Sequence, residues 1–162
     1  FLGMMGSGKS SIGYLVSKKL NLKFMDIDSL IEDEAGMSIS NIFKEKGEDY
    51  FRILEEKITL KTLKSSVCVI SLGGGGFINE KIRREILTNH FSFWLQWDGE
   101  TLLKRIKSNN KRPLALKSTQ QEIKQLIKKR SKIYTKAKFK INCNKLTKNE
   151  IVKKITKIYE LN

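Results

Sequence analysis

The residues best suited to do chemistry in this chain stand near its beginning, in the stretch GMMGSGKS. Residues 3–10 have the spacing G-x-x-x-x-G-K-S, which is typical of a loop that binds phosphate groups. The glycines let successive backbone N–H groups point at one anion, Lys9 supplies a mobile positive charge, and the hydroxyl of Ser10 is an oxygen ligand that Mg²⁺ accepts. We therefore expect a nucleotide's phosphates to bind Gly6, Ser7, Gly8, Lys9, Ser10 and Ser11.

Two carboxylates, Asp26 and Asp28, form a second candidate site. The alternation over residues 22–25 predicts a strand that finishes at residues 26–28, so both side chains would point to the same side of it. In open α/β sheets the ligand binds at this end of the strands. One carboxylate could serve Mg²⁺ and its water shell, and the other a substrate hydroxyl. The alternative is that Asp28 caps a helix, because it precedes the sequence Ser-Leu-Ile.

An arginine and a glycine run supply further candidates. Arg52 and Glu55 lie one turn apart on a helix predicted from residue 47 to about residue 64. They form either an ordinary surface pair or an arginine held by its own carboxylate so that it can bind an anion. Four glycines, residues 73–76, directly follow the apolar strand predicted at 67–72. Glycines at the end of a strand let the backbone approach a ligand closely.

A polar, basic segment interrupts the helical pattern in the second half of the chain. Residues 108–114 contain the only proline, and we predict a mobile lid over the phosphate-binding loop, at about 108–119. Arg112 within it could meet the charge that develops on a transferred phosphoryl group. The alternative is a plain surface loop with a solvated arginine.

Strand and helix patterns alternate around these candidate residues. They predict an α/β fold: a doubly wound, about five-stranded parallel sheet flanked by helices in three layers. We expect one domain over residues 1–162, with a helical substrate-binding insertion at about 28–64 and the lid as a second insertion. The strand before the phosphate-binding loop is short, so we expect a few residues to precede Phe1. The predicted helix boundaries are Asn21, Gly36, Ser40, Gly47, Asn79, Asp98, and capping boxes at Thr119 and Thr147.

Composition limits the classes of function. The 162 residues include 32 Lys and Arg against 17 Asp and Glu, a net charge of +15 that a nucleic-acid-binding protein would also show. The charge is spread over several predicted helices, which favours a solvated surface, and we expect neither nucleic-acid nor membrane binding. Cys68 and Cys143 have no metal-site spacing and suit a reducing cytoplasm. His90, the only histidine, is predicted to be structural or exposed.

Taken in order, these motifs resemble the shikimate kinase family, in the nucleoside-monophosphate-kinase branch of the P-loop folds. The resemblance covers nearly the whole chain. The motifs are GMMGSGKS at 3–10, FMDID at 24–28, GEDYFRILE at 47–55, SLGGG at 71–75, KRPL at 111–114 and R-x-x-x-Y at 130–134. The resemblance implies transfer of the γ-phosphoryl group of ATP to the 3-hydroxyl of shikimate, which yields shikimate 3-phosphate and ADP, with Mg²⁺ as the metal.

The resemblance also implies a role for each matching residue. Asp28 contacts the accepting hydroxyl as base or orienter, Asp26 holds the Mg²⁺ water shell, and Ser10 is a direct ligand. Lys9 and Arg112 are catalytic through their charge. The remaining assignments are Arg52 and Arg130 on the shikimate carboxylate, Glu55 on Arg52, Gly73, Gly74 and Gly75 against shikimate, and Arg105 and Lys145 on the two faces of adenine.

Two other readings remain open. Another small-molecule kinase of the same branch, such as a gluconate kinase or a nucleotide kinase, would share the phosphate-binding loop. A P-loop ATPase that binds nucleic acid would account for the charge of +15 and would bind in a salt-sensitive way. We expect a cytoplasmic monomer that binds ATP and shikimate.

Overall fold

The computed structural model describes residues 1–108 and 118–162. Within these residues four parallel strands form the centre of the fold. They form two pairs, β1 with β2 and β3 with β4. The strands are β1 (Lys23–Asp26), β2 (Cys68–Ser71), β3 (Phe93–Gln96) and β4 (Phe139–Asn142).

Phe1 and Leu2 join the two pairs into one sheet. The backbone of Phe1 donates to Ile70 and accepts from Leu72, while Leu2 donates to Phe93 and accepts from Leu95. The resulting order is β1, β2, residues 1–2, β3, β4, with every neighbour parallel. The prediction of a doubly wound, five-stranded parallel sheet is therefore confirmed.

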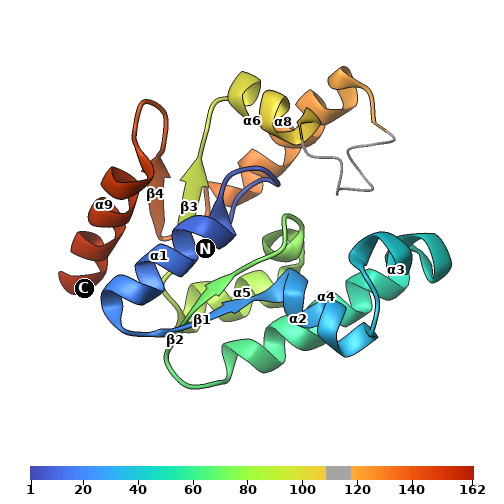
Figure 1. The fold of residues 1–162 in the computed structure, drawn as a ribbon, viewed down its shortest axis with the longest axis horizontal. Helices are drawn as coiled ribbons and strands as arrows, with labels where there is room; N and C mark the ends of the chain where they lie inside the picture. Colours follow the sequence, from blue (N-terminus) through green and yellow to red (C-terminus); the bar gives the residue numbers. More distant parts are fainter. Residues whose placement is uncertain (109–117) are drawn as a thin grey trace.

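Helices cover both faces of this sheet (Figure 1). Helices α1 (Lys9–Leu20) and α9 (Lys148–Glu160) pack side by side on one face, where Phe93 and Leu95 of β3 point. Trp94, between them in sequence, joins the larger core on the other face. That core is covered by α2 (Ile27–Ala35), α3 (Ile39–Glu45), α4 (Gly47–Leu63), α5 (Glu80–Asn89), α6 (Gly99–Lys107) and α8 (Gln120–Tyr134).

Most predicted helix boundaries are confirmed by their capping contacts. Thr119 and Thr147 each form a complete capping box, and the side chains of Asn79 and Asp98 accept N–H groups of the helices that follow them. The third helix differs from the prediction: it is capped by Ser38, whose hydroxyl accepts from Asn41 at 3.3 Å, and not by Ser40.

The strand that carries the two carboxylates is shorter than predicted. It ends at Asp26, and α2 begins at Ile27, because the Asp26 carboxylate accepts the backbone N–H of Asp28 at 3.0 Å and of Ser29 at 3.5 Å. The predictions that the strand reaches Asp28 and that Asp28 could be the cap are therefore wrong. Asp26 is the cap, and Asp28 lies in the first turn of the helix.

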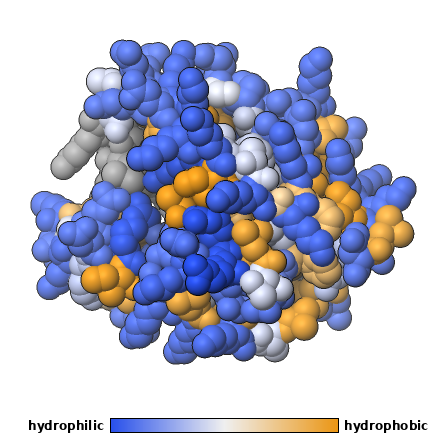
Figure 2. Space-filling view, turned by 180° about the vertical axis from the view of Figure 1, so that it is seen from behind, coloured by the Kyte–Doolittle hydropathy of each residue, from blue (hydrophilic) through white to orange (hydrophobic). Residues whose placement is uncertain are grey.

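The surface of the described residues agrees with a solvated basic shell. The face seen from behind Figure 1 is mostly hydrophilic, with apolar residues reaching the surface in a few places (Figure 2). Along α8 and α9 the exposed lysines include Lys124, Lys128, Lys129, Lys132, Lys153, Lys154 and Lys157. No helix in the described part of the chain is both long and apolar enough to cross a membrane. Most of the predicted lid, with Arg112, falls outside the described residues.

We expect Ile155→Ala to lower the free energy of unfolding by about 2–5 kcal/mol, because it empties space in the core under α9. Ile155 is 1% exposed there, whereas Ile53 on α4 is 71% exposed, so Ile53→Ala is the matched control. The control is expected to stay within about 0.5 kcal/mol of the parent. Urea unfolding followed by circular dichroism measures both; equal losses would contradict the layered packing described above.

Candidate active site

The chemically suited residues gather at one edge of the sheet. The phosphate-binding loop follows residues 1–2, Asp26 ends β1 with Asp28 two residues beyond it, and the glycine run follows β2, so all of them lie at carboxyl ends of parallel strands. A cleft of about 430 Å³ opens among them. Its lining combines residues from all three segments: Met5, Gly6, Gly8, Lys9, Ser10, Ser11, Asp28, Leu72, Gly74, Arg105 and Ser108.

The phosphate-binding loop has the geometry of an anion site. Gly6 and Gly8 have φ of 81° and 85°, left-handed values that favour glycine, and they turn the chain into the N-terminus of α1. The side chain of Lys9 is buried, and its Nζ donates to the carbonyl oxygens of Gly3 at 3.0 Å and Met4 at 3.1 Å. The loop therefore holds an ammonium group beside the positive end of a helix dipole, a place that attracts phosphate.

Arg52 is held by two carboxylates of its own helix. Its Nη1 donates to Glu55 Oε2 at 2.7 Å, and its Nε and Nη2 donate to Glu48 Oε1 at 3.2 and 2.9 Å. Burial alone would lower the pKa of Arg52, but the charges and hydrogen bonds of Glu55 and Glu48 outweigh it and raise the pKa above its usual value. The interpretation of Arg52 as an arginine oriented by its own carboxylate agrees with this geometry.

Two of the glycines make room for these charged groups. A Cβ added to Gly73 would lie 2.6 Å from both Asp28 Oδ1 and Glu55 Oε1, and one added to Gly75 would collide with the guanidinium of Arg52. Gly76 differs, because an added Cβ would meet nothing closer than 3.6 Å. Gly76 begins the short 3₁₀ helix η1 (Gly76–Ile78) and is not part of the close approach.

Arg130 and Tyr134, both on α8, donate hydrogen bonds to the glycine loop. Arg130 Nη1 donates to the carbonyl of Gly74 at 3.2 Å, and the Tyr134 hydroxyl donates to the same oxygen at 2.6 Å. Burial raises the pKa of Tyr134 to about 12, so the hydroxyl remains a donor at neutral pH. Sequence reasoning gave Tyr134 no role, although its spacing of four from Arg130 on a helix indicates a shared face.

Of the two residues that the resemblance assigns to adenine, one lines the cleft and the other does not. The guanidinium carbon of Arg105 lies 3.8 Å from the centroid of the Trp97 ring, and Arg105 also lines the cleft. Lys145 is exposed, with a φ of 62°, in the loop between β4 and α9. Lys145 does not line the cleft.

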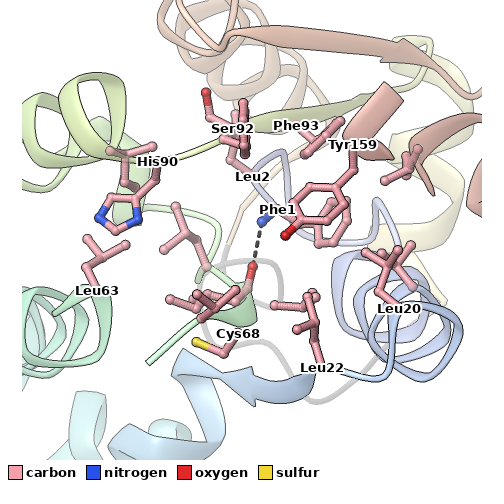
Figure 3. A pocket seen from close by; sticks show the side chains of 18 of the residues that line it. Phe1, Leu2, Leu20, Leu22, Leu63, Cys68, His90, Ser92, Phe93 and Tyr159 are labelled. Atoms are coloured by element: carbon pink, nitrogen blue, oxygen red, sulfur yellow. Dashed lines mark hydrogen bonds between the residues drawn. The ribbon is translucent and has the colours of Figure 1, made fainter. Parts of the chain in front are cut away.

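A second cavity, also of about 430 Å³, lies at the amino ends of the strands (Figure 3). Leu20, Leu22, Leu63, Phe93 and Tyr159 give it mainly apolar walls, and His90 and Cys68 lie at its border. None of the candidate residues named above lines it, and its lining within the described part of the chain contains no lysine, arginine, aspartate or glutamate.

Comparisons with known proteins agree with this geometry. Residues 5–160 match the protein family described as "Shikimate kinase". A shikimate kinase from Sulfurihydrogenibium sp. is 43% identical over 158 residues, which cover 97% of this chain and 95% of that protein. The solved shikimate kinase of Aquifex aeolicus is 38% identical with a TM-score of 0.88, over 98% of this chain and 94% of that one. A solved shikimate kinase from Acinetobacter baumannii in complex with shikimate is 27% identical with a TM-score of 0.92, over 99% and 91%.

We expect Gly73→Ala to lower the free energy of unfolding by about 1–3 kcal/mol, because its methyl group would push against two carboxylates. Gly76→Ala is the matched control in the same loop, where the methyl group fits. It is expected to leave stability unchanged or to raise it by up to about 1 kcal/mol, because it restricts the unfolded chain. Chemical unfolding of both variants decides the point, and a harmless Gly73→Ala would show that the loop does not pack as described.

Proposed function

The chain belongs to the shikimate kinase family, and we propose on that premise that it transfers the γ-phosphoryl group of ATP to the 3-hydroxyl of shikimate. The products are shikimate 3-phosphate and ADP. The observation that carries the proposal is that one cleft is lined by the phosphate-binding Lys9, by Asp28 and by Gly74. Arg130 donates to the carbonyl of Gly74. Donor phosphates and an acceptor acid would therefore meet between groups that the fold already orients.

The donor side works chiefly through charge and position. Phosphoryl transfer requires alignment of the reactants and neutralisation of developing charge more than it requires a strong base. The backbone of the loop from Gly6 to Ser11 and the ammonium of Lys9 would hold the phosphates. Arg105 and Lys145 would flank the adenine, and Arg112, which lies outside the described residues, would meet the charge that develops on the transferred phosphoryl group.

Mg²⁺ is compatible with the residues at this edge of the sheet. It keeps several waters and usually takes only one or two protein oxygens together with substrate phosphates. Ser10 is exposed in the first turn of α1, and Asp26 is fixed at the end of β1 by capping α2. We assign Ser10 as a direct ligand and Asp26 to the water shell. When bound, the ion would neutralise charge on the β- and γ-phosphates.

The acceptor side recognises a carboxylate. Arg52 and Arg130 would bind the carboxylate of shikimate, with Glu55 holding Arg52, because guanidinium–carboxylate hydrogen bonds are charge-assisted and strongly directional. The half-exposed Glu48 now accepts from the Nε and Nη2 edge of Arg52, which is the edge that a ligand carboxylate would use. Shikimate would displace Glu48 there and leave the contact with the buried Glu55 intact.

The position of Asp28 suits contact with the accepting hydroxyl. It lies at the cleft, with Oδ1 against Gly73, whose neighbours Gly74 and Gly75 would approach shikimate through their backbone. Asp28 would orient the hydroxyl and accept its proton as the new O–P bond forms. In this arrangement residues 28–64 form the acceptor-binding insertion of a single domain, which we propose acts as a cytoplasmic monomer.

The direct test is release of ADP from Mg-ATP with shikimate, gluconate or a nucleoside monophosphate as acceptor. Stimulation by shikimate alone is expected. Stimulation by a different acceptor would keep the phosphoryl-transfer chemistry and reassign the two-arginine site. Release that no acceptor stimulates, together with salt-sensitive binding of nucleic acid, would favour an ATPase instead.

We expect Asp28→Asn to lower kcat by about 100-fold or more, because an amide cannot accept the hydroxyl proton. Binding of ATP, measured by calorimetry, is expected to stay near that of the parent. Turnover close to the parent's would remove Asp28 from its assigned role.

We expect Arg52→Ala and Arg130→Ala each to raise the KM for shikimate by about 10- to 100-fold, because each removes a charge-assisted hydrogen bond to the carboxylate. The KM for ATP should change much less. Arg84→Ala is the control, since Arg84 is 79% exposed on α5. An unchanged KM for shikimate in both variants would disprove the two-arginine site.

A further inference from the structure

We propose that Trp97 is a positioning residue of the nucleotide site, which holds Arg105 for stacking on adenine and at the same time steadies the phosphate-binding loop. The inference rests on the proposed role of Arg105, which the resemblance supplied. The contribution of Trp97 comes from its contacts in this chain and has no counterpart in the motifs discussed above.

One side chain contacts both halves of the nucleotide site. Trp97 directly follows β3, at the carboxyl end of the sheet, and its indole Nε1 donates to the carbonyl oxygen of Ser7 at 2.9 Å. The guanidinium of Arg105, in the last turn of α6, lies over the same indole with Cζ 3.8 Å from the ring centroid. The indole therefore links the loop that would hold the phosphates to the arginine that would hold the base.

The stacking contact limits the freedom of a long side chain. An arginine on a helix surface samples many rotamers, whereas a guanidinium resting on an indole is attracted to the ring face by a cation–π interaction. Trp97 lies on one side of the guanidinium, and Arg105 also lines the cleft. Adenine would stack on the opposite face, in the order indole, guanidinium, base, so the arginine needs little ordering when the nucleotide arrives.

The hydrogen bond from Trp97 to Ser7 affects the loop that would hold the phosphates. It directs the carbonyl of Ser7 toward the indole, and a carbonyl turned toward Trp97 is not turned toward the phosphates that the loop would hold. The loop and α6 are already close, since a Cβ added to Gly6 would lie 3.4 Å from Cβ of Arg105. Loss of the indole N–H would free this carbonyl, whereas loss of the whole ring would also free Arg105.

Two substitutions separate these contributions. Trp97→Phe keeps an aromatic face and removes the N–H donor. It should therefore weaken the binding of ADP and of inorganic pyrophosphate alike, by about two- to tenfold. Trp97→Leu removes the ring as well. It should weaken the binding of ADP by about tenfold beyond Trp97→Phe, without a further effect on the binding of pyrophosphate. In both variants the KM for shikimate should stay within about twofold of the parent's, because the acceptor site lies on α4 and α8.

The decisive measurement is a double-mutant cycle between Trp97→Leu and Arg105→Ala, with the dissociation constants of ADP and pyrophosphate measured by calorimetry. If Trp97 acts through Arg105, the two tryptophan substitutions should differ little once Arg105 is alanine. In that background Trp97→Leu should weaken the binding of ADP little more than Trp97→Phe does. Unchanged ADP binding in Trp97→Leu, or fully additive losses, would overturn the inference. Unchanged ADP binding in Arg105→Ala would refute the role of Arg105 and the inference with it. Failure of the proposed function is separate, because it appears as absent shikimate-dependent turnover in the parent.

A spectroscopic readout covers the case in which Trp97→Leu does not fold. The chain has two tryptophans, so in Trp94→Phe the fluorescence comes from Trp97 alone. ADP should change that emission more than pyrophosphate does, because only ADP places a base on the guanidinium that the indole carries. Equal responses to ADP and pyrophosphate would show that Trp97 does not sense the base.

Discussion

A buried carboxylate, that of Glu55, is the constraint on which the placement of Arg52 and of the glycine loop depends. Its side chain is 2% exposed, and a charge at that depth is tolerated only when it is paired. Arg52 supplies the pair at 2.7 Å, which fixes the arginine while leaving 31% of its side chain exposed. The cost of burying Glu55 is therefore offset by a guanidinium that is already oriented before any ligand binds.

The glycine loop carries this constraint to the rest of the site. Gly73 fits between the carboxylates of Glu55 and Asp28, and the carbonyl of Gly74 accepts hydrogen bonds from Arg130 and Tyr134. A Cβ on Gly74 would also lie 3.3 Å from the backbone nitrogen of Met5, in the phosphate-binding loop. The loop after β2 therefore packs against the phosphate-binding loop and against Arg130 at the same time, and glycines, which have no side chain, fit between them.

Local patterns in the sequence were sufficient for much of this arrangement. The phosphate-binding loop, the capping boxes at Thr119 and Thr147, and the alternation of strands and helices are set by neighbouring residues, so each could be predicted from a short window. Which of the two carboxylates caps the following helix could not be predicted in this way. Asp26 rather than Asp28 caps α2, and this choice depends on where the strand leaves its partner β2.

Two of the contacts that could not be predicted from the sequence cross long distances along the chain. Tyr134 reaches Gly74 across 60 residues, and Trp97 reaches Ser7 across 90. The sequence offered only weak signals for them: a tyrosine four residues from an arginine, and a tryptophan at the end of a strand. Both lie close to the candidate site because parallel strands bring their carboxyl ends together, and not because of any local pattern.

Arg52 and Arg130 are proposed to bind the carboxylate of the acceptor without help from the nucleotide, because both are already oriented by the protein. Calorimetric titration of the protein without nucleotide, with shikimate and then with its methyl ester, tests this claim most directly. Shikimate is expected to bind, and the ester, which lacks the negative charge, is expected to bind at least about tenfold more weakly. Equal affinity for the two compounds would contradict it.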